Sequence, residues 1–111
     1  MESETDKIDR IFQYTLNHFS EKISLEDIAA RVNISPKAFC RYFKSRTRKT
    51  FSQFLLEVRI GHACKLLSED RASISEICYE CGFNNISNFN RYFKILTKTT
   101  PLRYRKAQLK D

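Results

Sequence analysis

The sequence holds only two glycines and two prolines among its 111 residues, and it has no tryptophan. Because Gly and Pro are the residues that most often mark turns, their scarcity argues against a chain built from many short strands. No apolar run reaches the roughly 18 residues of a membrane helix, and no signal-peptide pattern is present. These absences predict a soluble, cytoplasmic protein that makes few turns.

Apolar residues are common enough to build a core. They make up 41% of the chain, which includes fourteen Phe or Tyr residues, and a chain of this composition folds into a globule. Their spacing follows the 3.6-residue period of amphipathic helices. The sequence therefore predicts an all-α protein that forms one domain, or two very small lobes that share a helix.

Acidic residues are missing from two stretches that are rich in Lys and Arg. Residues 35–50 hold six basic side chains and residues 90–110 hold seven, and neither stretch contains Asp or Glu. The net charge of +7 is thus concentrated outside residues 1–30, which hold seven acidic and three basic side chains. Such clustering is typical of proteins that bind polyanions. The ordinary alternative is a basic surface that only contacts solvent. That alternative is less favoured because basic clusters occur in two stretches and not in one.

The most basic aromatic segment occurs twice. Phe39-Cys-Arg-Tyr-Phe-Lys44 returns fifty residues later as Phe89-Asn-Arg-Tyr-Phe-Lys94. Upstream the offset is 49, so one residue is inserted between Gly82 and Ser87. Each copy has a short apolar segment, then a turn at Asn33 or Gly82, then a basic amphipathic segment. This order is that of a DNA-binding helix-turn-helix unit.

Helix start signals divide the chain into about seven helices. The signals are Ser24, Ser35-Pro36, Thr50, the capping box Ser73-Ile-Ser-Glu76, and Thr100-Pro101. The helices that they and the apolar spacing predict cover about residues 6–19, 25–31, 36–47, 51–68, 74–81 and 86–96, with a short last helix from 101. Leu16, Leu25 and Leu96 are expected on the inner faces of their helices.

The helix expected over residues 51–68 separates the two copies. Two recognition helices on one face of B-DNA must lie ~34 Å apart to enter successive major grooves, and a stiff helix would fix such a spacing where a flexible linker would not. We therefore divide the chain into a first helix-turn-helix lobe with its packing helix over residues 1–50, a linker helix over 51–68, and a second lobe over 69–111.

From about Ile8 to Lys106 the chain resembles the DNA-binding region of the AraC/XylS family of bacterial transcription regulators. The motifs that carry the resemblance are Ser24-Leu-Glu-Asp-Ile-Ala29, Phe39 to Lys44, Arg59-Ile-Gly-His-Ala-Cys-Lys-Leu-Leu67, Ile74-Ser-Glu-Ile-Cys-Tyr-Glu-Cys-Gly-Phe83, Asn88-Phe-Asn-Arg-Tyr-Phe-Lys94 and Thr100-Pro-Leu-Arg-Tyr-Arg105. The resemblance implies two helix-turn-helix lobes joined by a long helix, whose third and sixth helices read adjacent major grooves. It also implies sequence-specific binding of double-stranded DNA as a monomer, and activation of transcription through RNA polymerase.

The resemblance also assigns residues to the DNA contact. The residues expected to read bases are Lys37, Cys40, Arg41, Ser87, Asn88, Asn90 and Arg91, and those expected at phosphates are Lys44, Ser45, Arg48, Lys94, Lys98 and Arg103. Arginine suits guanine O6 and N7, and asparagine suits adenine; phosphate clamping is the alternative for each arginine. Cys40 offers only a weak hydrogen bond or a thymine-methyl contact, which leaves the specificity of the first half-site open.

Cysteine and histidine form no recognisable reactive site. Cys78-Tyr-Glu-Cys81 has the spacing of redox and zinc motifs, but it aligns with the apolar Ala29 and Val32 of the first copy, and no second pair completes a tetrahedron. We interpret both cysteines, and Cys64, as core residues. The two histidines, at positions 18 and 62, are expected at the surface, without a nucleophile and acid at triad spacing. The sequence therefore predicts neither an enzyme nor a metal or cofactor.

Two other functions fit the same helices. A helical protein-interaction module would use the aromatic residues at its surface, whereas the spacing turns them inward. A DNA-targeting unit of a larger repair or signalling protein is the second alternative. We expect the sequence to be a C-terminal fragment of a larger regulator, with a small stand-alone regulator as the alternative.

Overall fold

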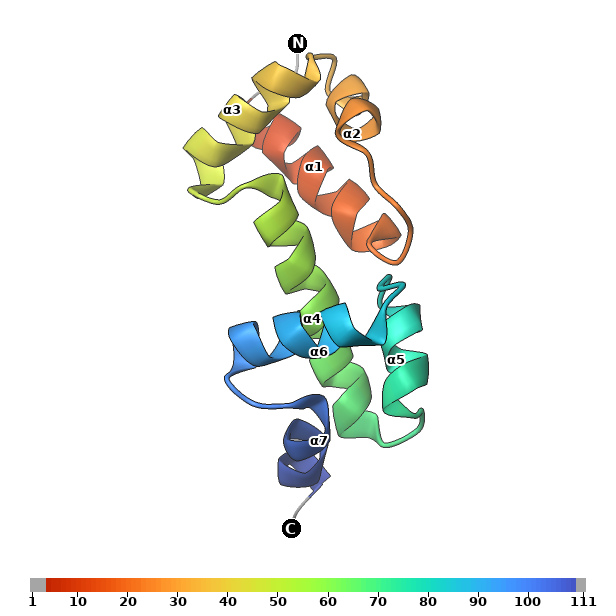
Figure 1. Ribbon diagram of the computed structural model, residues 1–111. Helices are drawn as coiled ribbons and strands as arrows, with labels where there is room; N and C mark the ends of the chain where they lie inside the picture. The colour runs from red at the N-terminus through yellow and green to blue at the C-terminus, as the bar shows by residue number, and fades with distance from the viewer. Residues whose placement is uncertain (1–3, 110–111) are drawn as a thin grey trace. The chain divides into compact units, whose positions relative to one another are not determined.

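The computed structural model describes residues 4–109, and all the secondary structure in this range is helical (Figure 1). Its helices are α1 (Glu4–His18), α2 (Leu25–Arg31), α3 (Pro36–Thr47), α4 (Phe51–Glu69), α5 (Ile74–Glu80), α6 (Ile86–Thr97) and α7 (Pro101–Leu109). The all-α prediction is confirmed, and the helix bounds agree with the sequence reading to within two residues. No described helix is long and apolar enough to cross a membrane.

The chain divides into two compact units, and the division falls between Leu55 and Leu56, inside α4. We call the described part of the first unit lobe 1 (residues 4–55) and that of the second lobe 2 (residues 56–109). Each lobe contains a seven-residue helix followed by a twelve-residue basic helix, which are α2 and α3 in lobe 1 and α5 and α6 in lobe 2. The repeat seen in the sequence is therefore a repeat of structure.

Two phenylalanines anchor the basic helix in each lobe. In lobe 1, Phe39 and Phe43 are fully buried, and their rings meet Phe51 edge-to-face with centroids 5.5 and 5.6 Å away. The other buried members of this core are Ile11, Ile28, Ala29 and Val32. Because the two phenylalanines lie four residues apart, they occupy one side of α3 and leave the opposite side to the solvent.

Lobe 2 repeats this arrangement with Phe89 and Phe93. Both are fully buried, and their rings lie 5.2 Å from Phe83 and 5.6 Å from Tyr104 respectively. The other buried members are Ile60, Ala63, Leu67, Ile77, Cys78 and Cys81. The two cysteines are free thiols with no exposed surface, which confirms the prediction that they are core residues.

Three leucines expected to face inward lie outside the cores. Leu16 is 48% exposed, Leu25 36% and Leu96 42%. In α1 the buried place goes to Thr15, whose hydroxyl donates to the Ile11 carbonyl at 2.8 Å and is thereby satisfied without water. In α6 the corresponding residue is Thr97, which is half-buried and whose hydroxyl donates to the Phe93 carbonyl in the same way. In both helices a threonine whose hydroxyl is satisfied by its own helix is more buried than the neighbouring leucine.

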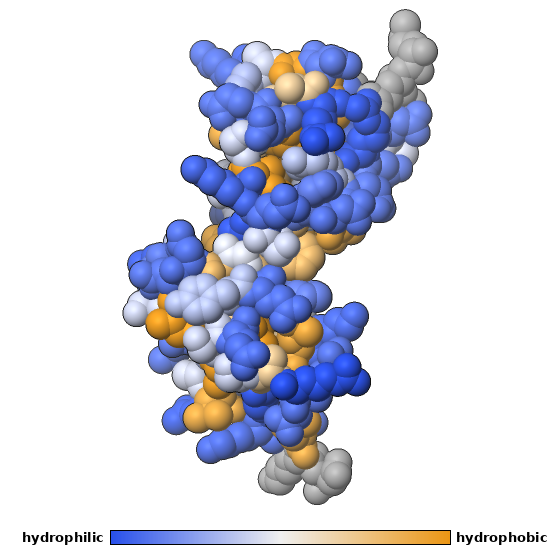
Figure 2. All heavy atoms as spheres, turned by 90° about the vertical axis from the view of Figure 1, so that its right-hand side faces the viewer, coloured by the Kyte–Doolittle hydropathy of each residue, from blue (hydrophilic) through white to orange (hydrophobic). Residues whose placement is uncertain are grey.

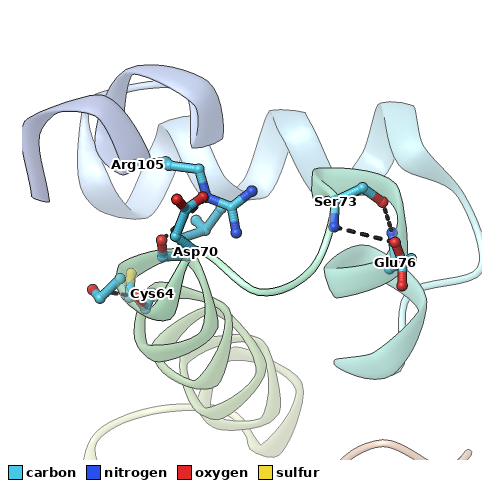
Figure 3. Close-up of polar contacts among 7 residues, drawn as sticks. Cys64, Asp70, Ser73, Glu76 and Arg105 are labelled. Atoms are coloured by element: carbon cyan, nitrogen blue, oxygen red, sulfur yellow. Dashed lines mark hydrogen bonds and ion pairs between the residues drawn. The ribbon is translucent and has the colours of Figure 1, made fainter. Parts of the chain in front are cut away.

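The predicted start signals all cap their helices. Ser24 and Ser35 accept from the amides of Asp27 and Ala38, and Ser73 forms the expected reciprocal capping box with Glu76 (Figure 3). Thr50 forms a second reciprocal pair with Gln53, and Thr100 accepts from the Arg103 amide. Asn33 and Gly82, the predicted turn residues, have φ of 59° and 98°. Local chemistry therefore fixes where these five helices, α2, α3, α4, α5 and α7, begin.

Candidate nucleic-acid interface

The two basic helices begin in the same way. Ser35 caps α3 by accepting from the Ala38 amide at 3.1 Å, and Asn85, fifty residues later, caps α6 by accepting from the Asn88 amide at 2.9 Å. The sequence analysis missed Asn85, although an asparagine directly before an apolar-periodic segment is a usual cap. The inserted residue of the second copy therefore lies between Gly82 and Asn85. From Asn85 onward the two helices are in register.

The outer face of α3 carries the residues that the sequence assigned to lobe 1. Lys37, Cys40, Arg41, Lys44 and Ser45 are all exposed, and the first turn of α3 has no acidic residue. The Ser45 hydroxyl donates to the Tyr42 carbonyl at 3.0 Å, so it would have to leave this bond before it could donate to a phosphate. The face is therefore strongly basic, and its long side chains all end in hydrogen-bond donors.

The outer face of α6 carries the corresponding residues of lobe 2. Ser87, Asn88, Asn90, Arg91 and Lys94 are all exposed. Arg91 is oriented by its neighbours: one guanidinium nitrogen lies 3.3 Å from the Asn88 side-chain oxygen and 3.3 Å from the Tyr92 hydroxyl. The guanidinium carbon lies 4.8 Å from the centre of the Tyr92 ring. This face holds fewer cations and more amide groups than that of α3.

A basic residue in the left-handed conformation ends each of these helices. Arg48 has φ of 64° and Lys98 has φ of 68°, and their amides donate to the carbonyls of Lys44 and Lys94 at 2.8 Å. The preceding threonine, Thr47 or Thr97, closes the turn with its hydroxyl. A non-glycine residue costs energy in this conformation, so the presence of a long cation at both positions marks them as candidates for phosphate contact.

The two arginines of α7 have different surroundings. Arg103 is exposed in the first turn. Arg105 is only 14% exposed as a side chain; its Nε donates to the Leu67 carbonyl at 3.1 Å and lies 3.8 Å from an Asp70 carboxylate oxygen (Figure 3). Arg105 therefore holds α7 against the carboxyl end of α4, whereas the Arg103 side chain is exposed to solvent.

The shifted pKa values belong to buried groups behind the outer faces. Burial raises the pKa of the Cys81 thiol to about 12 and also raises those of Cys78 and Cys64. Burial lowers the pKa of Arg59, whose guanidinium lies 6.0 Å from the centre of the Phe83 ring. Among residues 4–109, no three His, Cys, Asp or Glu side chains are grouped so that they could hold a metal ion. Burial thus keeps these three thiols protonated to a higher pH than a free thiol.

One visible face of the molecule is mainly hydrophilic. Figure 2 shows charged and polar side chains over most of it, with apolar atoms in smaller areas between them. Two further exposed cations are Arg46, in the last turn of α3, and Lys49, which follows the helix. These two were not assigned individually in the sequence analysis, although they lie in the first acid-free stretch and could have been taken from it.

A family model described as a helix-turn-helix domain matches residues 28–107. Among curated relatives, the uncharacterized HTH-type transcriptional regulator YdeC of Bacillus subtilis is 38% identical over 89 residues, which cover 80% of this chain and 31% of YdeC. An uncharacterized HTH-type regulator encoded in the cgkA 5' region of Pseudoalteromonas carrageenovora is 34% identical over 94 residues, which cover 85% of this chain and 55% of that protein. The chain thus spans between about a third and about half of these two relatives.

Solved structures place the fold in the same group. An AraC-type regulator from Chromobacterium violaceum superposes with a TM-score of 0.87 at 27% identity, over 94% of this chain and 93% of that one. The DNA-binding domain of AdpA, solved in complex with a target DNA, superposes with a TM-score of 0.85 at 29% identity, over 91% of each chain. The family is a class of transcription regulators and not a class of enzymes. These similarities do not favour the alternative function as a helical protein-interaction module. The chain belongs to the AraC-type helix-turn-helix family of DNA-binding transcription regulators.

Proposed function

We propose that this chain binds one double-stranded DNA site as a monomer, with α3 in one major groove and α6 in the next. The observation that carries the proposal is that each basic helix buries a phenylalanine pair on one side and exposes an acid-free row of donors on the other. A major groove accepts a single α-helix presented in this way. The DNA-binding domain of AdpA, which has the same fold and was solved in complex with a target DNA, supports it.

The base contacts that we propose come from the outer faces of the two helices. The residues are Lys37, Cys40 and Arg41 on α3, and Ser87, Asn88, Asn90 and Arg91 on α6. They lie in the first half of each helix, close to its cap, where recognition helices of helix-turn-helix proteins contact base edges. The two helix-turn-helix units follow one another in the same order along one chain. We therefore expect the two half-sites to be arranged as a direct repeat and not as a palindrome.

The phosphate contacts that we propose come from the ends of these helices and the start of α7. The residues are Lys44, Ser45, Arg48, Lys94, Lys98 and Arg103, all of them exposed. Their positions at or after the last turn of α3 and α6 would place them at the groove edge when the first turns contact bases. Neutralised phosphates release counterions, so each such contact makes binding weaker as salt rises.

Selection of bound duplexes from a random DNA pool, followed by titration at several salt concentrations, tests this function. We expect one enriched site with two short elements about one helical turn apart, bound ~10³-fold or more tighter than random DNA. Binding without enrichment, with a steep dependence on salt alone, would reduce the proposal to a general polyanion surface.

We also infer that the bound chain activates transcription by contacting RNA polymerase. The support for this step is the family to which the chain belongs. A reporter assay tests it, with the selected site placed upstream of a weak promoter. Increased expression that depends on the site fits activation, whereas unchanged or reduced expression contradicts it.

A further inference from the structure

Arg91 is held in place by two neighbours on its own helix. Its guanidinium lies 3.3 Å from both the Asn88 side-chain oxygen and the Tyr92 hydroxyl, and stacks over the Tyr92 ring at 4.8 Å. The backbone of Asn88 is fixed by the cap, because its main-chain N–H donates to the Asn85 side-chain oxygen at 2.9 Å. A side chain that is already ordered loses less rotamer freedom when it binds. The two contacts therefore favour one orientation of the Arg91 guanidinium group.

Arg41, the equivalent residue of α3, lacks this support. The residue at the place of Asn88 is Ala38, which has no side-chain acceptor. Tyr42 replaces Tyr92, but the cations over its ring are Lys7, at 5.3 Å, and Arg46, at 5.5 Å. Within residues 4–109 Arg41 forms no hydrogen bond or ion pair. The two equivalent arginines thus differ in support: Arg91 has two side-chain partners, and Arg41 has none within residues 4–109.

The contact with Arg91 also changes what Asn88 can read. A guanidinium only donates hydrogen bonds, so the amide oxygen of Asn88 must face it and the amide nitrogen points elsewhere. Adenine needs both an acceptor for its N6 amino group and a donor for N7. The oxygen keeps a second lone pair, but while it faces Arg91 it is not turned toward a base edge together with the amide nitrogen, so the groups that the pair offers outward are mainly donors. The pair therefore matches base edges that carry two acceptors, which in the major groove means guanine N7 and O6.

We propose that Asn88 and Tyr92 are positioning residues that hold Arg91 for a guanine, so that α6 supplies more of the sequence discrimination than α3 does. The proposal rests on the DNA-binding function proposed above and adds a division of labour between the lobes. The residues of α3 agree with it, since Cys40 is a weak hydrogen-bonding group where α6 has Asn90. Adenine reading in lobe 2 then falls to Asn90 and not to Asn88.

The test compares Tyr92→Phe and Asn88→Ala with Tyr42→Phe in the full chain. Each variant is titrated with the selected duplex, with duplexes in which each base pair of the site is changed singly, and with random DNA. We expect the two α6 variants to lose roughly three- to tenfold in discrimination at one G·C pair, the factor for one lost hydrogen bond. Affinity for random DNA and the salt dependence should stay unchanged. Tyr42→Phe, matched in repeat position and burial, should leave discrimination intact.

The base pair affected identifies the mechanism. If Asn88→Ala and Tyr92→Phe reduce discrimination at the same G·C pair as Arg91→Ala, and add little to Arg91→Ala when combined with it, the positioning role holds. If Asn88→Ala acts at a separate A·T pair, Asn88 reads adenine directly and the proposal is overturned. Unchanged discrimination in both α6 variants overturns it as well. Failure of the wild-type chain to enrich any site would instead reject the DNA-reading function itself.

Discussion

Lobes 1 and 2 share the same set of helix caps and buried rings, which we call the frame, and they differ in the exposed side chains of their basic helices. The shared parts are equivalent in position: the caps Ser35 and Asn85, the phenylalanine pairs, and the left-handed Arg48 and Lys98. The outer faces diverge, with alanine and cysteine in α3 where α6 has two asparagines. Because the frame is built from buried rings and terminal hydrogen bonds, it does not constrain the exposed side chains. The same fold can therefore carry two different binding surfaces in one chain.

The largest effect is expected from the buried rings. Phe39→Ala and Phe89→Ala should each lower the free energy of unfolding of their lobe by ~3–5 kcal/mol, because both side chains are fully buried among other rings. Denaturant unfolding followed by circular dichroism measures this. The exposed Ser45→Ala is the control and should change stability by less than ~0.5 kcal/mol. A loss below ~1 kcal/mol for either phenylalanine would show that the two cores are not equivalent.

Alkaline pH should separate the lobes, because the buried Cys81 stands where lobe 1 has Val32. The folded state keeps the Cys81 thiol neutral, with a pKa raised from 9.0 to about 12. An unfolded chain ionises near the lower value, so this contribution to stability is present below pH 9 and is lost between about pH 9 and 12. At ~1.4 kcal/mol per pKa unit, the loss is at most about 4 kcal/mol.

Cys81→Val copies the first lobe into the second and removes this titration. We expect the variant to keep more of its neutral-pH stability at pH 10.5 than the wild type does, in urea unfolding at both pH values. Val32→Cys should confer the same alkaline sensitivity on lobe 1. Equal pH dependence in wild type and Cys81→Val would assign the alkaline loss to other groups, such as the Tyr104 hydroxyl, whose pKa is also raised by burial.

Arg41→Ala and Arg91→Ala should weaken DNA binding in different ways. Loss of Arg91 should cost ~1–3 kcal/mol at a single G·C pair and relax specificity there. Loss of Arg41, which has no positioning partner among the described residues, should relax specificity at its own base pair by a smaller factor and also weaken binding to other sequences. Titration of selected and random duplexes at three salt concentrations distinguishes the two. Identical profiles for both variants would mean that the lobes do the same work.

The caps should show the smallest effects and the closest agreement between the lobes. Ser35→Ala and Asn85→Ala should each cost ~1 kcal/mol in stability, because each leaves a first-turn amide without its partner. The exchanges Ser35→Asn and Asn85→Ser should change stability by only a few tenths of a kcal/mol, since both residues cap well. Thermal unfolding measures all four. A large loss in either exchange would show that the two caps are not interchangeable.

Much of the fold follows from the sequence because its signals are local. Capping residues, the turn at Asn33 and the fifty-residue repeat gave the helices and their order, and all of these depend on neighbours in the chain. The inward positions of Leu16, Leu25 and Leu96 were wrong because helical periodicity gives a face but not its width. Which residues close that face depends on the elements packed against it, as Thr15 and Thr97 show.

The sequence predicted which side of each basic helix is exposed, but it did not predict the contacts that the exposed side chains make with one another. The exposure of the assigned residues follows from the phenylalanine pairs on the opposite side, so the sequence was enough to place them. The link from Asn88 and Tyr92 to Arg91 depends on rotamers, and a helix offers several for each of these long side chains. The function of Arg105 in holding α7 was also not resolved by sequence, because Leu67 and Asp70 lie more than thirty residues away from it.

The register between the two basic helices has a practical consequence for engineering. From Ser35 and Asn85 onward, any outward position of α6 has a counterpart in α3 whose backbone, cap and buried anchors are already equivalent. Lys37→Ser, Ala38→Asn and Cys40→Asn together would therefore install the recognition surface of the second helix on the first without redesigning a core. The outer face of α6 can thus serve as the template for α3. A single chain with two like recognition helices would then be a design target for a DNA site with two like halves.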